Sequence, residues 1–307
     1  MEAPKKTVII IVGPTAVGKT HVAIEVARCF KTEILSADSR QCYRELKIGV
    51  ARASEEELRR IPHHFIATHS IKEEVSAAGF EQYALRQVQT LFQHHDQLVM
   101  TGGTGLYIKA FCEGLDQIPP IDPLIRNEII KGYEENGLSW LQEQVQQKDP
   151  AFYSVGEIQN PQRLMRALEV VEGTGISILT FRKGEPRKRD FEILLIGLQL
   201  PKEELHRNID ARVDKMMLEG LEEEARSLLP WRNLKALQTV GYAELFDYFD
   251  GKTSLEKAVA QIKTNTRQYA KRQMTWFRKA KQITWFNPRD LNAILHFVQA
   301  HTKLDFY

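Results

Sequence analysis

The segment Thr7–Thr20, with the sequence TVIIIVGPTAVGKT, decides the fold class of this chain. Residues Thr7–Val12 form a continuous β-branched run, which is typical of a strand buried on both faces of a parallel sheet. The remaining residues follow the pattern of a glycine, four residues and then Gly-Lys-Thr. Apolar residues at helical spacing come next, with Val22, Val26 and Phe30 on one face. The order of strand, glycine-rich turn and helix predicts a phosphate-binding loop (P-loop).

Each part of this loop has a chemical role. Glycines let backbone N–H groups surround phosphate oxygens, and the helix N-terminus adds the positive end of its dipole. The ammonium group of Lys19 can neutralise phosphate charge, and the hydroxyl of Thr20 can ligate Mg²⁺. We therefore predict a site for phosphate and magnesium, formed by Gly13, Pro14, Thr15, Ala16, Val17, Gly18, Lys19 and Thr20.

Strand and helix patterns alternate through the first part of the chain. Short apolar runs at Glu33–Leu35, Phe65–Ala67, Leu98–Thr101 and Ile193–Leu198 predict further strands. Apolar residues keep helical spacing between Phe80 and Phe92. This alternation indicates an α/β fold, with a mostly parallel, P-loop NTPase-like sheet flanked by helices.

A helical segment interrupts the alternation. The proline-rich run Ile118–Pro123 marks a boundary. Helical patterns follow at Leu124–Glu134, Leu138–Gln147 and Pro161–Gly173, the last with Asn160 as its N-cap. The expected domains are a P-loop catalytic core with C-terminal helices, residues 1–118 and 190–307, and an inserted helical subdomain, residues 119–189.

The composition excludes several classes of protein. A content of 43% hydrophobic and 27% charged residues is that of an ordinary globular protein, and no apolar run approaches the roughly 20 residues that cross a bilayer. The polar start, Met1–Thr7, predicts no signal peptide. The cysteines Cys29, Cys42 and Cys112 lack the paired spacing of a zinc site or a disulfide framework. We expect a reduced, cytoplasmic protein with no membrane association.

Two more motifs follow predicted strands. Ser36–Ser39, with the sequence SADS, places Asp38 at the carboxyl end of a strand, where ligands of open α/β sheets bind. Its carboxylate could ligate magnesium or accept a proton from a nucleophile, and the alternative is a turn or cap residue. Thr101–Gly105, with the sequence TGGTG, offers hydroxyls and close backbone approach, although a tight turn is the commoner explanation.

The C-terminal part of the chain carries a basic segment. Every charged residue from Lys257 to Arg289 is lysine or arginine, and a long helix is predicted over Ser254–Ala280. Within it, Tyr269–Arg278 interleaves cations with aromatic rings, a pattern that suits phosphates and unpaired bases of RNA. The alternative is an amphipathic helix with solvated cations. For Trp276 and Phe277 we predict positions in the core.

Together these motifs resemble the tRNA dimethylallyltransferase family, also called tRNA isopentenyltransferases. The resemblance extends from Val8 to about Phe286. Several ordered motifs in one chain are far more specific than any single motif. The matching segments are GPTAVGKT, SADSRQCYRELKIG, TGGTGLYIKAFCEGL, NPQRLMRALEV, LQTVGYAEL and YAKRQMTWFR.

The resemblance implies a reaction. Dimethylallyl diphosphate would bind with its diphosphate in the P-loop, together with Mg²⁺. The dimethylallyl group would move to N6 of the adenosine just 3′ of the anticodon of tRNA, and diphosphate would leave. Asp38 would take the proton of the adenine amine, and Thr101 would help to orient the reacting groups. The adenine would have to flip out of its stack to reach this site.

The resemblance also implies which residues contact the substrates. Arg212 matches a position that contacts the diphosphate. The expected macromolecular partner is the anticodon stem-loop of tRNA, bound by a monomeric enzyme. The residues implied for tRNA binding are Asp38, Ser39, Arg40, Gln41, Thr101, Arg126, Gln162, Arg163, Leu164, Met165, Arg166, Gly241, Tyr242, Lys271, Arg272, Gln273 and Arg278.

The chain departs from the family pattern at one point. Where the family commonly has Ile-Gly-Thr-Ala-Lys, this chain has Val50 and Arg52 in place of the threonine and lysine.

Three other functions are alternatives to prenyl transfer to tRNA. A small-molecule kinase would share the P-loop but would not need the basic aromatic segment. An adenylate isopentenyltransferase would not need the inserted helices. A non-catalytic nucleic-acid binder would leave the P-loop and Asp38 without a role.

Overall fold

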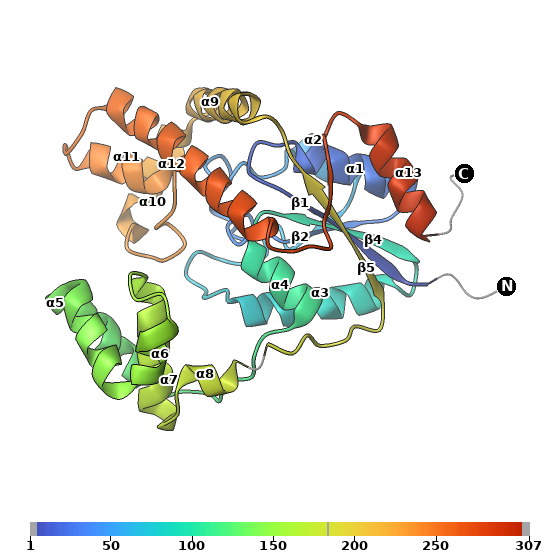
Figure 1. Cartoon of the computed structure of the whole chain (residues 1–307). Helices are drawn as coiled ribbons and strands as arrows, with labels where there is room; N and C mark the ends of the chain where they lie inside the picture. Colours follow the sequence, from blue (N-terminus) through green and yellow to red (C-terminus); the bar gives the residue numbers. More distant parts are fainter. Residues whose placement is uncertain (1–4, 183, 303–307) are drawn as a thin grey trace. The chain divides into compact units, whose positions relative to one another are not determined.

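A computed structural model describes residues 5–182 and 184–302 (Figure 1). The chain divides into two compact units. The core unit comprises Met1–Cys112 and Lys188–Tyr307, and the inserted unit comprises Glu113–Arg187. The limits expected from the sequence, 119 and 189, lie within a few residues of these boundaries.

The core unit is built on a six-stranded sheet in which every pairing is parallel. Its strand order is β3-β2-β4-β1-β5-β6. The strands are β1 (Thr7–Val12), β2 (Ile34–Ser36), β3 (His63–His64), β4 (Gln97–Gly102), β5 (Glu192–Leu198) and β6 (Thr284–Phe286). The predicted α/β fold with a parallel sheet is confirmed.

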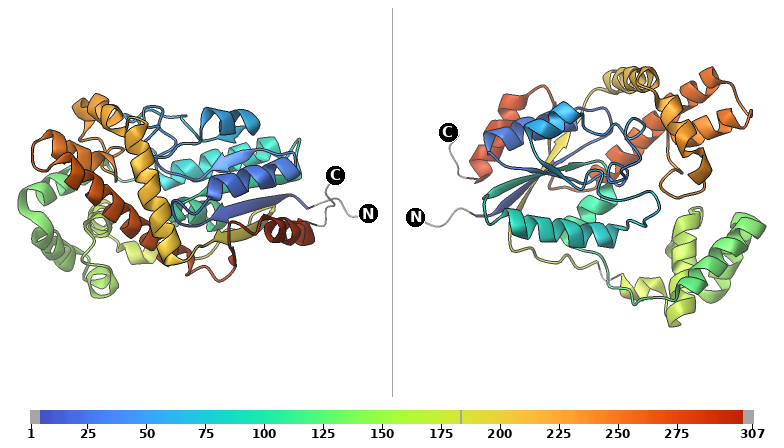
Figure 2. Two further views of the ribbon diagram at one scale, coloured as in Figure 1. Left: turned by 90° about the horizontal axis from the view of Figure 1, so that it is seen from above. Right: turned by 180° about the vertical axis from the view of Figure 1, so that it is seen from behind.

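Helices cover both faces of this sheet (Figures 1 and 2). Residues of β1 alternate between two cores because successive side chains of a strand point to opposite faces. Ile9 and Ile11 pack with α1, α9 and α13, whereas Val8 and Ile10 pack with α3, α4 and α10 to α12. The helices are α1 (Lys19–Cys29), α2 (Glu55–Arg60), α3 (Ala77–Leu91), α4 (Gly105–Glu113), α9 (Lys202–Leu218), α10 (Leu221–Leu228), the 3₁₀ helix η1 (Leu229–Trp231), α11 (Tyr242–Phe249), α12 (Leu255–Phe277) and α13 (Leu291–Thr302).

The inserted unit is helical and has its own core, which includes Leu141, Phe152 and Leu168. Gly137, with φ at +76°, interrupts α5 between the two helices that the sequence predicts there. The side chain of Asn160 accepts a hydrogen bond from the N–H of Arg163, so the predicted N-cap is present. The helices are α5 (Pro123–Lys148), α6 (Pro150–Val155), α7 (Pro161–Thr174) and α8 (Ile178–Phe181).

One local expectation was wrong, and one short strand was not predicted. The edge strand β3 lies at His63–His64, not at Phe65–Ala67. Phe65 and Ala67 have left-handed backbone, with φ at +62° and +51°, and the Phe65 ring is buried against Phe80. The short strand β6 was missed, although its sequence, Thr-Trp-Phe, consists of residue types that favour strands, because it is only three residues long. Within the described residues, no helix is long and apolar enough to cross a membrane.

Candidate active site

The loop between β1 and α1 has the backbone of a phosphate cradle. Gly13 and Gly18 have φ at +151° and +100°, values that side chains disfavour. A Cβ on Gly13 would lie 2.7 Å from the carbonyl oxygen of Leu198, so glycine is required there. The loop leads directly into α1, whose first residue is Lys19. The positive end of the helix dipole therefore points into the loop.

Two cations converge on this loop. Lys19 Nζ donates a hydrogen bond to the Pro14 carbonyl oxygen at 2.7 Å. Burial and the charge of Arg212 lower the pKa of Lys19 to about 7, although Asp38 opposes this shift. Arg212, from α9, donates to the Thr15 hydroxyl at 3.4 Å, and burial lowers the pKa of its guanidinium as well. An anion placed between the two cations would relieve their repulsion, so the loop favours a multiply charged ligand.

Asp38 lies just beyond β2 and forms a turn. Its Oδ1 accepts hydrogen bonds from the N–H groups of Arg40 and Gln41, at 2.8 and 3.2 Å. The turn role that the sequence left open is therefore present. Among the described residues, none donates a hydrogen bond to Oδ2. The turn fixes the orientation of the carboxylate while leaving one oxygen available for proton transfer.

The TGGTG segment joins neighbouring strand ends. The Thr101 hydroxyl donates to the Ile11 carbonyl oxygen at 3.2 Å, so its lone pairs remain available as acceptors. A Cβ on Gly102 would overlap the backbone of Ala37, so this glycine permits close approach of the loops after β2 and β4. The Thr104 hydroxyl accepts from Ser39 N–H at 3.0 Å. Gly102 therefore permits close packing of the loop that carries Asp38 against the loop after β4.

All of these elements line one cleft of about 860 Å³ in the core unit. The loop 47–52 and helix α9 complete its wall. The residues expected from the sequence that line this cleft are Thr15, Ala16, Gly18, Lys19, Thr20, Asp38, Ser39, Arg40, Gln41, Thr101, Arg212, Gly241 and Gln273.

Helix α12 is tied to the cleft by Gln273. Its Oε1 accepts from Thr15 N–H at 2.8 Å, and its Nε2 donates to the Gly103 carbonyl oxygen at 3.0 Å. The side chain is only 7% exposed. Both ends of its amide already hold backbone groups, so Gln273 connects the basic helix to the P-loop. Its expected contact with RNA stays a prediction.

The other side chains of the basic segment divide between core and surface. Phe277 is buried, as predicted. Trp276 is 38% exposed and packs over Gly105, where a Cβ would overlap its ring, so its prediction as a core residue was wrong. Lys271, Arg272 and Arg278 are exposed, and their predicted contacts with RNA phosphates stay predictions.

Three expectations for RNA binding need correction. Leu164 and Met165 are buried in the core of the inserted unit, because they lie on the inner face of α7. Tyr242 is fully buried in the core unit. These three side chains are therefore inaccessible to RNA. Their neighbours Gln162 and Arg163 are exposed, while Arg126 and Arg166 pair with Glu169 at 2.8 and 2.7 Å.

Sequence reasoning missed Glu224, which holds a wall of the cleft. Its carboxylate accepts hydrogen bonds from the N–H groups of Ile48 and Gly49, each with a shortest distance of 2.9 Å, and from the Tyr242 hydroxyl at 2.7 Å. A Cβ on Gly49 would lie 2.6 Å from the Tyr242 ring. The buried Tyr242 and the half-buried Glu224 thus fix the loop 47–52. In the sequence, Glu224 is one of three consecutive glutamates, which gives no sign of this role.

Replacing Glu224 with Gln is expected to lower the free energy of unfolding by about 1–3 kcal/mol, because an amide NH₂ would face donors that need an acceptor. Equilibrium urea denaturation measures this change. Glu223, exposed on the same helix, provides the matched control, and Glu223→Gln should change stability by less than about 0.5 kcal/mol. Equal effects of the two substitutions would contradict the role assigned to Glu224.

Comparisons with known proteins show what this chain is similar to. A family model described as IPP transferase matches residues 41–280. A tRNA dimethylallyltransferase of Cytophaga hutchinsonii is 44% identical over 295 residues, covering 96% of this chain and 97% of that protein. One of Christiangramia forsetii is 49% identical over 278 residues, covering 91% and 92%. A full-length tRNA isopentenylpyrophosphate transferase of Bacillus halodurans has a similar crystal structure, with a TM-score of 0.72, 33% identity and 97% of each chain covered.

Proposed function

The chain belongs to the IPP transferase family, and we propose that it transfers a dimethylallyl group from dimethylallyl diphosphate to N6 of the tRNA adenosine 3′ to the anticodon. The observation that carries this proposal is the convergence of Lys19 and Arg212 on the P-loop, with the carboxylate of Asp38 in the same cleft. A leaving diphosphate requires positive charge beside it, and a nucleophilic amine that loses a proton requires a negatively charged carboxylate close by.

The P-loop side of the cleft supports departure of the diphosphate. As the allylic C–O bond breaks, negative charge develops on the leaving oxygen. The ammonium of Lys19, the guanidinium of Arg212 and the N-terminus of α1 are arranged to stabilise that charge. Because these groups are already held by the loop, little reorganisation is needed when the bond breaks.

The Asp38 carboxylate supports formation of the C–N bond. The adenine N6 amine is a weak nucleophile, because its lone pair is delocalised into the ring. As N6 bonds to the allylic carbon, one of its protons would pass to Oδ2 of Asp38, while Oδ1 stays bound to the Arg40 and Gln41 N–H groups. The Thr101 hydroxyl could accept a hydrogen bond that orients the amine.

Most ligands of a magnesium ion at this site would come from the diphosphate of the substrate. Among the described residues, no group of three or more His, Cys, Asp or Glu side chains is placed to hold a metal ion. Thr20, on the first turn of α1, lines the cleft and offers a hydroxyl ligand. When bound, Mg²⁺ would neutralise charge on the diphosphate, whose oxygens would supply further ligands. We expect the enzyme to be a monomer and to bind tRNA in the cytoplasm.

The exposed cations of α12 are proposed to bind RNA phosphates. Replacing both Lys271 and Arg272 with Ala should weaken tRNA binding and reduce the slope of log Kd against log salt by about two units, one per lost contact. Lys257, about 20 Å away along the same helix, provides the control, and Lys257→Ala should leave the slope unchanged. An unchanged slope in the double variant would show that Lys271 and Arg272 are only solvated helix charges.

Acceptor competition tests the proposed function. Labelled dimethylallyl diphosphate is incubated with the enzyme and magnesium, in the presence of tRNA, AMP or both. The proposal predicts label on tRNA alone. Label on AMP would favour adenylate prenylation, and label on neither acceptor would refute prenyl transfer.

A further inference from the structure

The buried amide of Gln273 joins the P-loop to the loop that follows β4. Gln273 accepts a hydrogen bond from Thr15 N–H at 2.8 Å and donates one to the Gly103 carbonyl oxygen at 3.0 Å. The next residue of the P-loop, Ala16, has left-handed backbone with φ at +62°. A residue with a side chain keeps this conformation only where its surroundings hold it. Gln273 therefore holds the P-loop immediately before its strained residue.

Gly103 leaves the space that this amide occupies. A Cβ on Gly103 would lie 2.2 Å from Gln273 Nε2. The φ of Gly103 lies outside the left-handed region, so the backbone conformation does not require glycine there. A methyl group at this position would displace the end of the flexible Gln273 side chain. The missing side chain of Gly103 is thus what allows Gln273 to reach the P-loop.

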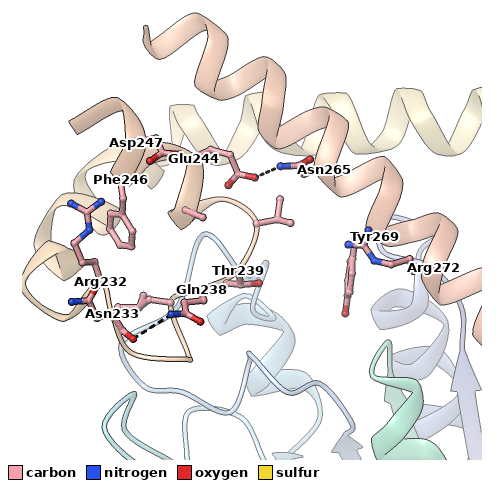
Figure 3. Close-up of a pocket in the computed structure, with 13 residues that line it drawn as sticks. Arg232, Asn233, Gln238, Thr239, Glu244, Phe246, Asp247, Asn265, Tyr269 and Arg272 are labelled. Carbon is pink, nitrogen blue, oxygen red and sulfur yellow. Dashed lines mark hydrogen bonds between the residues drawn. The ribbon is translucent and has the colours of Figure 1, made fainter. Parts of the chain in front are cut away.

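Helix α12, which carries Gln273, is fixed to two other helices of the core unit. Asn265 Nδ2 donates a hydrogen bond to Glu244 Oε1 of α11 at 2.6 Å (Figure 3). Two ion pairs, each with a distance of 2.5 Å, join α12 to α9: Arg267 with Asp210, and Lys263 with Asp214. The same helix α9 carries Arg212, which donates to the Thr15 hydroxyl. Gln273 therefore extends from a support that is itself held in place.

We propose that Gln273 is a positioning residue for the diphosphate, which keeps the P-loop in its phosphate-binding shape and acts through the loop, not by binding RNA. A cradle that is already ordered loses less conformational freedom when its ligand binds, and this raises its affinity for the ligand. The inference rests on the proposed function, because that function supplies diphosphate as the ligand of the loop.

Titrations of inorganic diphosphate, with magnesium and without any acceptor, test this role. Gln273→Ala should raise the Kd for diphosphate by roughly 5- to 50-fold, the effect of one or two lost hydrogen bonds. Gln268 is exposed on the same helix and does not line the cleft, so Gln268→Ala should leave this Kd unchanged. The Kd of Gln273→Ala for an anticodon stem-loop, measured without diphosphate, should also match that of the wild-type enzyme. An unchanged diphosphate Kd, or an equal loss of affinity for the stem-loop, would overturn the proposal.

A double-mutant cycle with Gly103 separates this role from general damage to the fold. Gly103→Ala keeps the glutamine but displaces its amide, so it should weaken diphosphate binding by a factor similar to that of Gln273→Ala. In the Gln273→Ala background, where the space is vacated, Gly103→Ala should cause no further loss. Additive losses would overturn the proposal.

Transfer kinetics give a readout that distinguishes positioning from catalysis. In Gln273→Ala, the KM for dimethylallyl diphosphate should rise while kcat changes little, because the variant loses binding that the ground state and the transition state share. A fall in kcat with an unchanged KM would contradict the role assigned to Gln273. Failure of the proposed function would be distinct: the wild-type enzyme would transfer no dimethylallyl group, and the diphosphate titrations would still decide the role of Gln273.

Discussion

Asp38→Asn is expected to slow single-turnover transfer to an anticodon stem-loop by about 10²–10⁴-fold. Asparagine keeps an oxygen that can accept from the Arg40 and Gln41 N–H groups, so the turn after β2 should survive. Its amide nitrogen cannot accept the proton of the adenine amine. Affinity for dimethylallyl diphosphate should change little, because Lys19, Arg212 and the P-loop are the groups proposed to hold that substrate.

A magnesium titration separates the two roles of Asp38 that the sequence leaves open. If the carboxylate accepts the proton, the defect of Asp38→Asn should persist at every magnesium concentration. If it ligates the metal, high magnesium should restore much of the rate. Such rescue would refute the general-base role. As a control for folding, the melting temperature of Asp38→Asn should match that of the wild-type protein more closely than that of Asp38→Ala, which loses the acceptor in the turn.

Lys19→Ala is expected to reduce the rate of transfer by about 10³-fold, because it removes the ammonium group that is proposed to neutralise the leaving diphosphate. Since Lys19 belongs to the P-loop and not to the exposed face of α12, tRNA affinity should remain close to that of the wild-type enzyme. Single-turnover kinetics measure the first quantity and a gel-shift titration the second.

Two outcomes would contradict the assignment of Lys19 to the diphosphate and of the exposed face of α12 to tRNA. A parallel loss of tRNA affinity in Lys19→Ala would place Lys19 in the RNA site. A nearly normal rate would show that Arg212 and the helix dipole suffice for the leaving group. Lys19→Arg provides a further comparison, because it keeps the charge on a larger, planar group and should recover only part of the rate.

The parts of the site that the sequence predicted are local in the chain. The P-loop, Asp38 and Thr101 each lie at or just beyond the end of a buried strand. The carboxyl ends of parallel strands meet at one edge of a sheet, so recognising the strands was enough to bring these residues together. The same reasoning failed at Phe65–Ala67, where an apolar run enters the core through left-handed backbone and forms no strand.

The contacts that the sequence missed join residues that lie far apart in the chain. Gln273 holds the N–H of Thr15, which lies 258 residues away, and Glu224 holds the N–H of Gly49, which lies 175 residues away. No local pattern distinguishes such a residue from an ordinary surface Gln or Glu. Burial likewise separates Tyr242, Leu164 and Met165 from their exposed neighbours, and burial is decided by the packing of whole helices.

Identification of the reaction product tests the central claim most directly. The enzyme, dimethylallyl diphosphate, magnesium and unmodified tRNA are incubated together, and the tRNA is then digested to nucleosides and analysed by mass spectrometry. The account predicts an adenosine that carries one dimethylallyl group on N6, located just 3′ of the anticodon, and formation of one diphosphate for each modified adenosine. A dimethylallyl group on another nucleoside, or diphosphate formed without any modified tRNA, would contradict it.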